Sequence, residues 1–574
     1  MNKQIAFLKQ IWRISQPYWK SEEKWIARLL LISIVVLTLG QVALQICFNQ
    51  WYNTFYTSLQ NLDKFAFVRN IQYFSLLAVL NIIIVVYSSY LTQMLTIRWR
   101  RWLTTHFLNR WLDKQNHYHM QIIGQPTDNP DQRISEDVSQ FTDLTLSLSL
   151  GLLSAVATVC FFTLILWTLS GPLNFHIGNF AIHIPGYLVW AALIYAIFGT
   201  LFVNKIGKPL VKLNFNQQRF EADFRFGMAR FRENSENIAF YQGEPQEKLG
   251  FTNLFSLIFG NYWQIMRRQK NLNWFTAFYT QLALIFPFLM ASPKLFSKQI
   301  TLGGVMQIVN AFGQVQGSLS YIINSYVGIA AWKATCDRLI SFTGQMQTAE
   351  QIDAFKRNYT KETHISVQNL QIKLPNGHVL GENMQLNLAQ GDSLLITGPS
   401  GSGKTTLLRT LSGLWPFAEG KVIIPEKANI LFIPQKPYLP LGTLKKVLCY
   451  PNQADDISDQ QVQETLQFCQ LAHLCGMLHE QADWSRILSV GEQQRVGFIR
   501  ALITCPDFLF LDEATSALDD AAECYLYQLL KTRCPNTCII SVGHKMSLKS
   551  WSNQEFMMAP MPRTSPPLTI PAVL

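Results

Sequence analysis

The cysteines of this 574-residue sequence form no CxxC pair, and no histidines stand at the spacing of a zinc site. The pair Cys534 and Cys538 and the pair His117 and His119 are too isolated to predict a metal site. Ten cysteines are scattered along the chain, seven of them after residue 440 (Cys449, Cys469, Cys475, Cys505, Cys524, Cys534 and Cys538). The sequence therefore predicts reduced thiols in a cytosolic domain.

Patterns of RNA-binding or DNA-binding modules are also absent, although the formal net charge is +11. Much of the Lys and Arg lies in segments that flank apolar runs, as in the cytoplasmic loops of membrane proteins. The charge therefore predicts membrane lipid as a partner, and no nucleic acid.

Charged residues are scarce at 15%, whereas hydrophobic residues make up 49%. The long apolar runs lie before about residue 330, and charge and turn residues are concentrated after it. A chain of this length usually holds more than one domain. We therefore predict a membrane unit followed by a soluble unit.

The N-terminus lacks the short apolar core of a signal peptide, so we expect it to be retained. Aromatic and basic residues alternate there, which is typical of a helix at the headgroup level, although a soluble helix can share the pattern. These residues are Trp12, Tyr18, Trp19, Lys20, Lys24 and Trp25. The sequence predicts an interfacial helix over residues 1–26.

Apolar stretches within residues 27–340 predict an all-α transmembrane domain of about six helices. Four stretches are long enough to cross ~30 Å of hydrocarbon. They are residues 27–48, 71–97, 144–169 and 184–203. A fifth, 274–296, contains Pro287 and Pro293, which predict a kink or an early end. The sixth, 303–331, is diluted by Gln, Asn, Ser and Gly.

Basic residues are confined to alternate loops. Five precede the first stretch, six follow the second, and eleven lie in residues 205–270, whereas the loops 171–183 and 297–302 are nearly free of them. Because positively charged short loops stay on the cytoplasmic side, both termini are predicted to be cytoplasmic.

A polar stripe follows the sixth stretch at helical spacing and comprises Gln307, Asn310, Gln314, Gly317, Tyr321 and Asn324. The first stretch adds Gln41, Gln45 and Asn49. Polar side chains in hydrocarbon are costly unless they face protein or water. We predict that they line a water-filled cavity; the alternative is hydrogen bonding between helices, with Gly313 and Gly317 allowing close approach.

Residues 341–362 are polar, carry charges of both signs and predict a linker. From His364 onward, short β-rich runs alternate with helical stretches. This alternation predicts an α/β domain around a largely parallel sheet over residues 363–555, followed by a Pro-rich tail over 556–574.

The motif GPSGSGKT, residues 398–405, follows the apolar run SLLIT and precedes a helical run. In such a P-loop the glycines let backbone N–H groups face phosphates, the lysine reaches the β and γ phosphates, and the threonine binds Mg²⁺. The predicted nucleotide-binding residues are Gly398, Pro399, Ser400, Gly401, Ser402, Gly403, Lys404, Thr405 and Thr406. Thr405 is also a predicted metal ligand.

A second apolar run, FLFLD, ends in Asp512 and Glu513. We expect Asp512 to hold Mg²⁺ through water and Glu513 to polarise the water that attacks the γ phosphate. An acidic pair at a strand end is common, so its meaning depends on the P-loop in the same domain. Together they predict a Mg²⁺-dependent ATPase.

Residues 488–496, LSVGEQQRV, resemble the signature motif of ATP-binding cassette proteins. Gln435, residues 516–519 and His544 resemble that family's Q-loop, D-loop and switch histidine. The resemblance implies that two such domains sandwich two ATP molecules, each P-loop facing the partner's signature. It implies that Ser489 and the Gly491 backbone bind γ phosphate in trans, that His544 contacts it, and that Gln435 binds Mg²⁺ and relays its presence to the membrane domain.

Two features depart from the family pattern. Val490 and Glu492 stand where the family has Gly and Gln. The position around Leu374, where an aromatic ring would stack on adenine, holds no aromatic residue, so no adenine-stacking residue is predicted.

Nearly the whole chain resembles the branch that joins peroxisomal fatty-acyl transporters to bacterial SbmA/BacA-like transporters with fused ATPases. The segments that carry this resemblance are NQWYNTFYTSLQNLD, RFEADFRFGMARFRENSENIAFYQGE, GPSGSGKTTLLRTLSGLWP and IPQKPYLPLGTLKKVLCYP. It implies an exporter-type fold and a homodimeric half-transporter of the bacterial inner membrane. It also implies a hydrophilic cargo, either a peptide or a cobalamin-like solute.

Three alternatives stay open at this point. The cargo of the peroxisomal branch would be a fatty-acyl compound or another lipid. The partner would be a similar half-transporter if the dimer is mixed. A membrane-anchored regulatory ATPase would need one span rather than six.

Overall fold

The computed structural model describes residues 2–122, 129–177, 180–321, 325–352, 355, 357–543 and 545–559. The chain divides into two compact units. The membrane unit comprises residues 1–110 and 128–344, and the cassette unit comprises residues 111–127 and 345–574.

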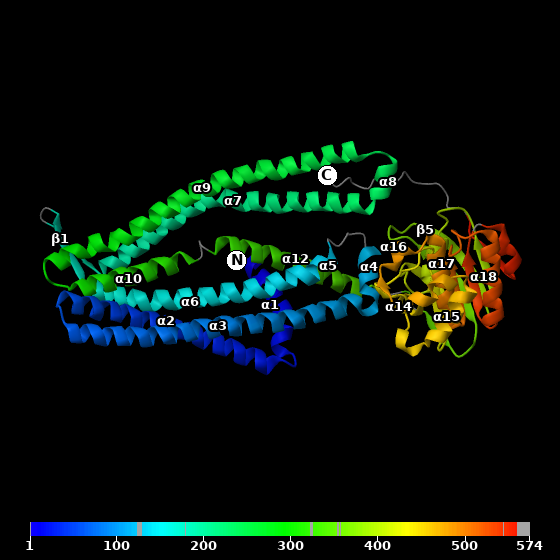
Figure 1. Cartoon of the computed structure of the whole chain (residues 1–574), viewed down its shortest axis with the longest axis horizontal. Coiled ribbons are helices and arrows are strands. Elements are labelled where there is room, and N and C mark those ends of the chain that lie inside the picture. The colour runs from blue at the N-terminus through cyan, green and yellow to red at the C-terminus, as the bar shows by residue number, and fades with distance from the viewer. Residues whose placement is uncertain are drawn as a thin grey trace. The chain divides into compact units, whose positions relative to one another are not determined.

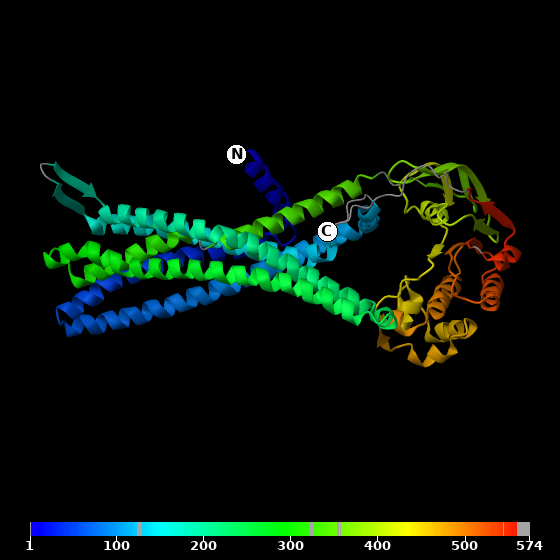
Figure 2. The same ribbon diagram turned by 90° about the horizontal axis from the view of Figure 1, so that it is seen from above.

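Long helices build the membrane unit, and they lie side by side in two perpendicular views (Figures 1 and 2). Strands β1 (Pro172–Ile177) and β2 (Phe180–Pro185) form an antiparallel hairpin between two of them. The helices are α1 (Asn2–Lys20), α2 (Lys24–Gln60), α3 (Lys64–Leu112), α5 (Pro130–Gln132), η2 (Arg133–Asp137), α6 (Val138–Ser170), α7 (Tyr187–Glu233), α8 (Ser235–Phe240), α9 (Glu244–Phe296), α10 (Leu302–Leu319) and α12 (Tyr326–Glu350).

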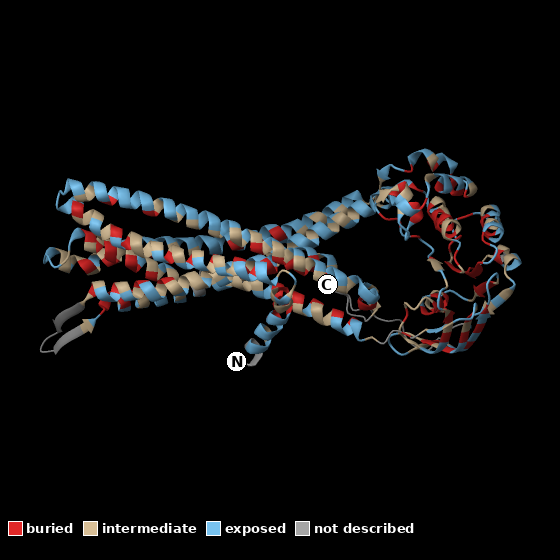
Figure 3. Ribbon diagram, turned by 90° about the horizontal axis from the view of Figure 1, so that it is seen from below, coloured by how far each residue is buried: buried red, intermediate tan, exposed pale blue. Residues whose placement is uncertain are grey.

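Among the described residues, five helical segments are long and apolar enough to cross a membrane, and they contain α2, α3, α6, α7 and α9. The fourth begins at Tyr187 rather than at Ile184, because Ile184 pairs with Leu173 in the hairpin. A kink or an early end is predicted for the fifth, and the early end is wrong, because the helix continues through Pro287 and Pro293 to Phe296. Figure 3 shows exposed residues along much of these helices, as expected for surfaces that face lipid.

The sixth predicted stretch is less apolar because its first helix is enclosed by protein. Helix α10 packs against α2, α6, α7 and α9, and its side chains Val305, Ile308 and Phe312 are almost fully buried. A helix surrounded by other helices does not need an apolar surface all round, since neighbouring helices can satisfy its amides. Hydropathy alone therefore does not find it.

The polar stripe of α10 forms hydrogen bonds with α2. Asn49, which is fully buried, donates to the Gln307 carbonyl oxygen at 2.9 Å and to Asn310 Oδ1 at 3.0 Å. Asn53 donates to Gln307 Oε1 at 2.9 Å. These bonds favour the helix-packing alternative over the predicted water-filled cavity at these positions.

The glycines that allow close approach are not the predicted ones. A Cβ at Gly303 would lie 2.0 Å from the Asn53 carbonyl oxygen, whereas a Cβ at Gly313 or Gly317 would meet nothing within 4 Å. Tyr321, also on the stripe, packs beside Gly151 of α6, and Asn324 lies outside the described residues.

Helix α1 packs one face against the membrane unit. Tyr18 is fully buried and stacks on Trp99 of α3, whereas Trp12 and Trp25 are exposed. The predicted linker also begins later than expected, because α12 continues to Glu350 with Phe342 and Met346 buried.

The cassette unit is built on two main sheets. The first has the strand order β13-β6-β12-β11-β8 and is parallel throughout, and the second has the order β3-β7-β4-β5. The strands are β3 (Asn358–Thr360), β4 (Ile365–Lys373), β5 (Val379–Leu388), β6 (Ser393–Thr397), β7 (Ala418–Pro425), β8 (Ile430–Ile433), β9 (Gly442–Thr443), β10 (Gln481–Ala482), β11 (Phe508–Asp512), β12 (Cys538–Val542) and β13 (Gln554–Met557).

Helices cover the parallel sheet, which explains why its strands are continuously apolar. Strands β6, β11 and β12 are buried at nearly every position, as parallel strands covered on both faces must be. The helices are η1 (Asp113–Gln115), α4 (Asn116–Ile122), α13 (Lys404–Leu411), α14 (Leu444–Cys449), η3 (Ala454–Asp456), α15 (Asp459–Phe468), η4 (Ala472–Met477), α16 (Trp484–Ile487), α17 (Val490–Thr504), α18 (Asp520–Arg533) and η5 (Met546–Trp551).

Candidate nucleotide site

The P-loop connects the buried strand β6 to helix α13, as predicted from the motif. Gly398, Gly401 and Gly403 have φ angles of +147°, +81° and +94°, a region that side chains with a Cβ rarely adopt. A Cβ at Gly398 would also lie 2.8 Å from the Met558 carbonyl oxygen. The glycines are therefore required by the backbone of the loop itself.

Gly398→Ala is expected to weaken ATP binding strongly, because the added methyl group strains the backbone and meets Met558. Binding of a fluorescent ATP analogue to the purified protein measures this. Gly377→Ala serves as the matched control: its φ is also positive, at +83°, but a Cβ there meets nothing within 4 Å. Equal binding by Gly398→Ala and wild type would contradict this role of the loop.

Lys404 lies over the loop, where its Nζ donates to the carbonyl oxygens of Gly398 at 2.8 Å and Pro399 at 3.0 Å. Burial lowers the pKa of Lys404, while Glu513 and Asp512 act in the opposite direction. Ser402 is almost fully buried and its Oγ has no hydrogen-bond partner in the described part of the chain. A cationic amine and an unsatisfied hydroxyl in one loop fit a phosphate group.

Two of the three predicted metal ligands, Thr405 and Asp512, meet directly. Thr405 Oγ1 donates to Asp512 Oδ1 at 3.1 Å, which joins the start of α13 to the end of β11. Burial raises the pKa of Asp512, and the Thr405 hydrogen bond counteracts this. A hydroxyl and a carboxylate are oxygen ligands of the kind that Mg²⁺ prefers, so this pair fits a Mg²⁺ ion.

Glu513 follows Asp512 at the end of the strand, with a φ of +48° and its N–H donating to the Val542 carbonyl oxygen at 3.0 Å. A non-glycine residue in this region of φ is uncommon and occurs often at functional sites. The backbone thus turns at the residue that was predicted to orient water. Thr406 follows within α13 and is half-buried.

Gln494 was missed by the sequence analysis, although it links three of the motifs. It is 1% exposed and donates to the Gln435 carbonyl oxygen at 3.1 Å and to Ser516 Oγ at 3.0 Å. Its Oε1 accepts from the Ala517 N–H at 2.9 Å. The Q-loop, the D-loop and the signature helix are therefore joined through one buried amide.

The Gln435 side chain is itself directed to the D-loop, since its Nε2 lies 3.5 Å from Ser516 Oγ. Its predicted contact with Mg²⁺ stays a prediction. His544 lies outside the described residues. Leu374 packs against the core of the cassette unit, which leaves adenine without an assigned aromatic partner.

The signature serine begins helix α17. Ser489 is its N-cap and forms a capping box with Glu492, in which each side chain bonds the other residue's backbone N–H. Val490 is 61% exposed, and Gly491 lies beside Leu518 of the D-loop region. This exposed helix start presents Ser489 and Gly491 at the surface of the cassette unit.

A segment of the predicted membrane domain belongs to the cassette unit. Helix α4 lies in residues 111–127, which cluster with the cassette, and its Ile122 packs against the same core as Trp415. Tyr118 is hydrogen-bonded to Arg409 of α13, and burial raises its pKa. The boundaries predicted from hydropathy miss this insertion because residues 111–127 are a polar loop in sequence.

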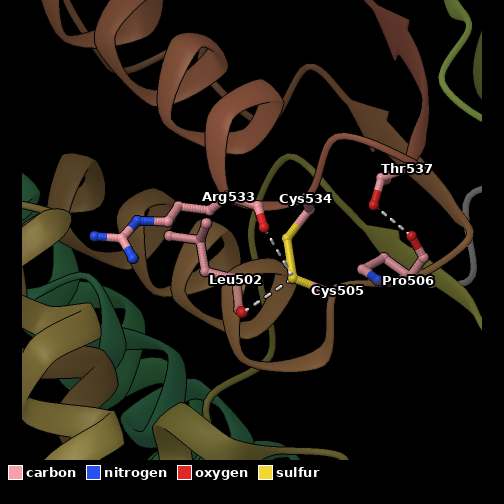
Figure 4. Close-up of a disulfide and its surroundings, with 6 residues drawn as sticks. All are labelled: Leu502, Cys505, Pro506, Arg533, Cys534 and Thr537. Carbon is pink, nitrogen blue, oxygen red and sulfur yellow. Dashed lines mark hydrogen bonds between the residues drawn. A yellow bond between two sulfur atoms is a disulfide. The ribbon is translucent and has the colours of Figure 1, made fainter.

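The expectation of reduced thiols is wrong for one pair of cysteines. Cys505 at the end of α17 and Cys534 at the end of α18 form a disulfide, with their Cα atoms 5.5 Å apart (Figure 4). Their separation of 29 residues gives no local signal in the sequence. Only the folding of two helices onto one sheet brings them together.

Each of the two units matches a known protein family. The chain matches the family ABC transporter transmembrane region 2 over residues 11–296 and the family ABC transporter over residues 381–516. A solved bacterial Atm1-family ABC exporter with ATP bound superposes with a TM-score of 0.70 over 93% of each chain, at 16% identity. The fold is therefore the exporter fold, with a helical transmembrane domain fused to a P-loop ATPase domain.

Three curated relatives align along nearly the full chain. The inner membrane ABC transporter ATP-binding protein YddA of Escherichia coli is 34% identical over 92% of this chain and 94% of its own. The chloroplastic ABC transporter D family member 2 of Arabidopsis thaliana is 33% identical over 95% and 85%. The human lysosomal cobalamin transporter ABCD4 is 26% identical over 94% and 92%. The chain is thus a multi-pass membrane protein that belongs to the ATP-hydrolysing ABC transporters, as a half-transporter fused to its ATPase and related to the D family.

Proposed function

We propose that a homodimer of this chain uses ATP hydrolysis to move a hydrophilic solute, such as a peptide or a cobalamin-like molecule, across the bacterial inner membrane. The similarity to the inner-membrane protein YddA supports the location in the inner membrane. The similarity to a cobalamin transporter supports a hydrophilic cargo. The resemblance to SbmA/BacA-like transporters points to the same class. Both termini face the cytoplasm in this proposal, because the basic loops do.

ATP binds in the P-loop, where the loop N–H groups, Lys404 and Ser402 hold its phosphates. Thr405 and Asp512 hold Mg²⁺, which supplies charge neutralisation at the phosphates when bound. Glu513 orients the attacking water, His544 contacts the γ phosphate, and the adenine contacts stay unassigned.

The homodimer is supported by the cytoplasmic half of α9. Phe255, Phe259 and Trp263 are each about half exposed and recur every four residues, so they form one helix face. Trp263 lies 11 residues, or roughly 16 Å, before the predicted apolar stretch at Trp274, where lipid does not cover it. A second copy of the chain would bury this apolar face, and its signature would complete the nucleotide site.

The observation that carries the cargo class is a cavity of about 540 Å³ in the membrane unit. It lies among η2, α6, α7 and α12, and its charged lining residues are Arg133, Glu136, Asp137, Arg219, Glu221, Arg225 and Arg338. Four glutamines also line it, whereas Phe215 is its single large apolar side chain in the described part of the chain. Such a lining suits a solute with polar groups rather than a free acyl chain.

The cargo is tested by the ATPase activity of proteoliposomes with a peptide, a cobalamin or an acyl-CoA. A hydrophilic solute should stimulate hydrolysis, and Arg225→Leu should raise the concentration needed for half-stimulation several-fold. Arg230→Leu, on the same helix but outside the cavity lining, is the matched control. Stimulation by the acyl-CoA alone would overturn the hydrophilic cargo in favour of the fatty-acyl alternative.

A further inference from the structure

The two hydrogen-bond donors of Ser489 are already used within the chain. Its backbone N–H donates to Glu492 Oε2 at 2.9 Å, and its hydroxyl donates to the same oxygen at 2.7 Å. In the proposed homodimer the partner's signature completes the nucleotide site, and the resemblance to ATP-binding cassette proteins implies that the Ser489 side chain binds the γ phosphate of the partner's ATP. A carboxylate oxygen therefore occupies the donors that the phosphate needs.

The second oxygen of Glu492 faces His473. His473 Nε2, on η4, lies 3.1 Å from Glu492 Oε1, and the His473 side chain is 58% exposed. Burial acts to raise the pKa of Glu492, but the hydrogen bonds from Ser489 and the nearby His473 outweigh it and lower the pKa. Glu492 is therefore a carboxylate at neutral pH, held between a hydroxyl and an imidazole.

A carboxylate and a γ phosphate are both negative and both accept hydrogen bonds. They cannot share the Ser489 donors, and their charges repel one another at short range. ATP binding in trans thus requires the Glu492 side chain to leave Ser489. Its Oε1 already contacts His473, so a small rotation toward the imidazole keeps the carboxylate partnered.

We propose that Glu492 is a positioning residue that holds Ser489 in a resting arrangement and releases it to the γ phosphate of the partner's ATP, with His473 receiving the displaced carboxylate. This inference rests on the proposed function, because it needs Ser489 to act in trans. A capping box alone would stabilise α17 without affecting the affinity for ATP.

Glu492→Gln tests the proposal, because the amide oxygen can still accept from Ser489 but carries no charge. In steady-state assays of the full-length protein, the KM for ATP should fall by about fivefold while kcat changes little. His473→Ala should raise the KM, since the displaced carboxylate loses its partner. Glu464→Gln on the exposed face of α15 is the matched control and should change neither constant.

Ser489→Ala separates this inference from the proposed function. Loss of hydrolysis in Ser489→Ala together with an unchanged or raised KM in Glu492→Gln would overturn the positioning role and leave Glu492 as a helix cap. Unchanged hydrolysis in Ser489→Ala would instead contradict the action of Ser489 in trans. Thermal unfolding of each variant shows that the fold is intact, because Gln also serves in a capping box.

Discussion

Glu513→Gln is expected to reduce ATP hydrolysis by about 10²–10⁴-fold while leaving ATP bound. The substitution removes the carboxylate that orients water but leaves the P-loop, Lys404 and the Thr405–Asp512 pair in place. Its backbone turn at a φ of +48° is retained, because Gln replaces Glu without changing shape. Phosphate release and binding of a fluorescent ATP analogue measure the two effects separately.

Lys404→Ala should lose ATP binding as well as hydrolysis, because the amine that reaches the phosphates is gone. Glu419→Gln is the control for Glu513→Gln, because it also replaces a carboxylate by an amide. Glu419 is exposed and pairs with Lys373, so this variant should hydrolyse ATP like wild type. Wild-type hydrolysis by Glu513→Gln would show that another residue is the catalytic carboxylate.

Asp137→Ala is expected to destabilise the membrane unit by about 3–5 kcal/mol. Asp137 is 2% exposed and accepts from Arg133 Nη1 at 2.6 Å and from Arg338 Nε at 2.9 Å. Its removal leaves two positive guanidinium groups without the carboxylate between them. The bond between Arg338 and Asp137 also joins α12 to η2, so its loss weakens the packing of these two helices.

The Tm of the detergent-solubilised protein measures this loss. Asp223→Ala is the matched control, because Asp223 is 52% exposed and lies 3.8 Å from Arg219 in a solvated pair that contributes little. Equal shifts of the Tm in both variants would show that the cluster of Arg133, Asp137 and Arg338 has no special role.

The P-loop could be located from the sequence because its residues are contiguous and their chemistry dictates their order. Gly398 and Gly403 adopt the positive φ angles of the loop, and Lys404 bonds a carbonyl oxygen of the same loop. The motif therefore specifies the local structure. Thr405 also meets Asp512, because the P-loop that precedes Thr405 follows β6 and Asp512 ends β11 of the same parallel sheet. Their positions depend on strands β6 and β11, whose continuous apolar runs are easy to recognise in the sequence.

Other parts of the site depend on tertiary contacts that no local pattern announces. Gln494 differs from its neighbour Gln493 only in what the folded chain places beside it. The same holds for Tyr118, which joins the cassette unit from a loop between two apolar stretches, and for the Cys505–Cys534 pair. In the membrane unit, hydropathy could not separate an amide that lines water from one that bonds another helix.

Crosslinking between two copies tests the central claim, a homodimer whose P-loops face the partner's signature. Ser400→Cys and Val490→Cys together, on a Glu513→Gln background that retains ATP, place thiols at two exposed positions beside the two motifs. With ATP and Mg²⁺, the purified single polypeptide should form a crosslinked dimer, and neither Ser400→Cys alone nor Val490→Cys alone should do so to the same extent. A protein with both introduced cysteines that stays monomeric on the gel with ATP present would contradict the homodimer.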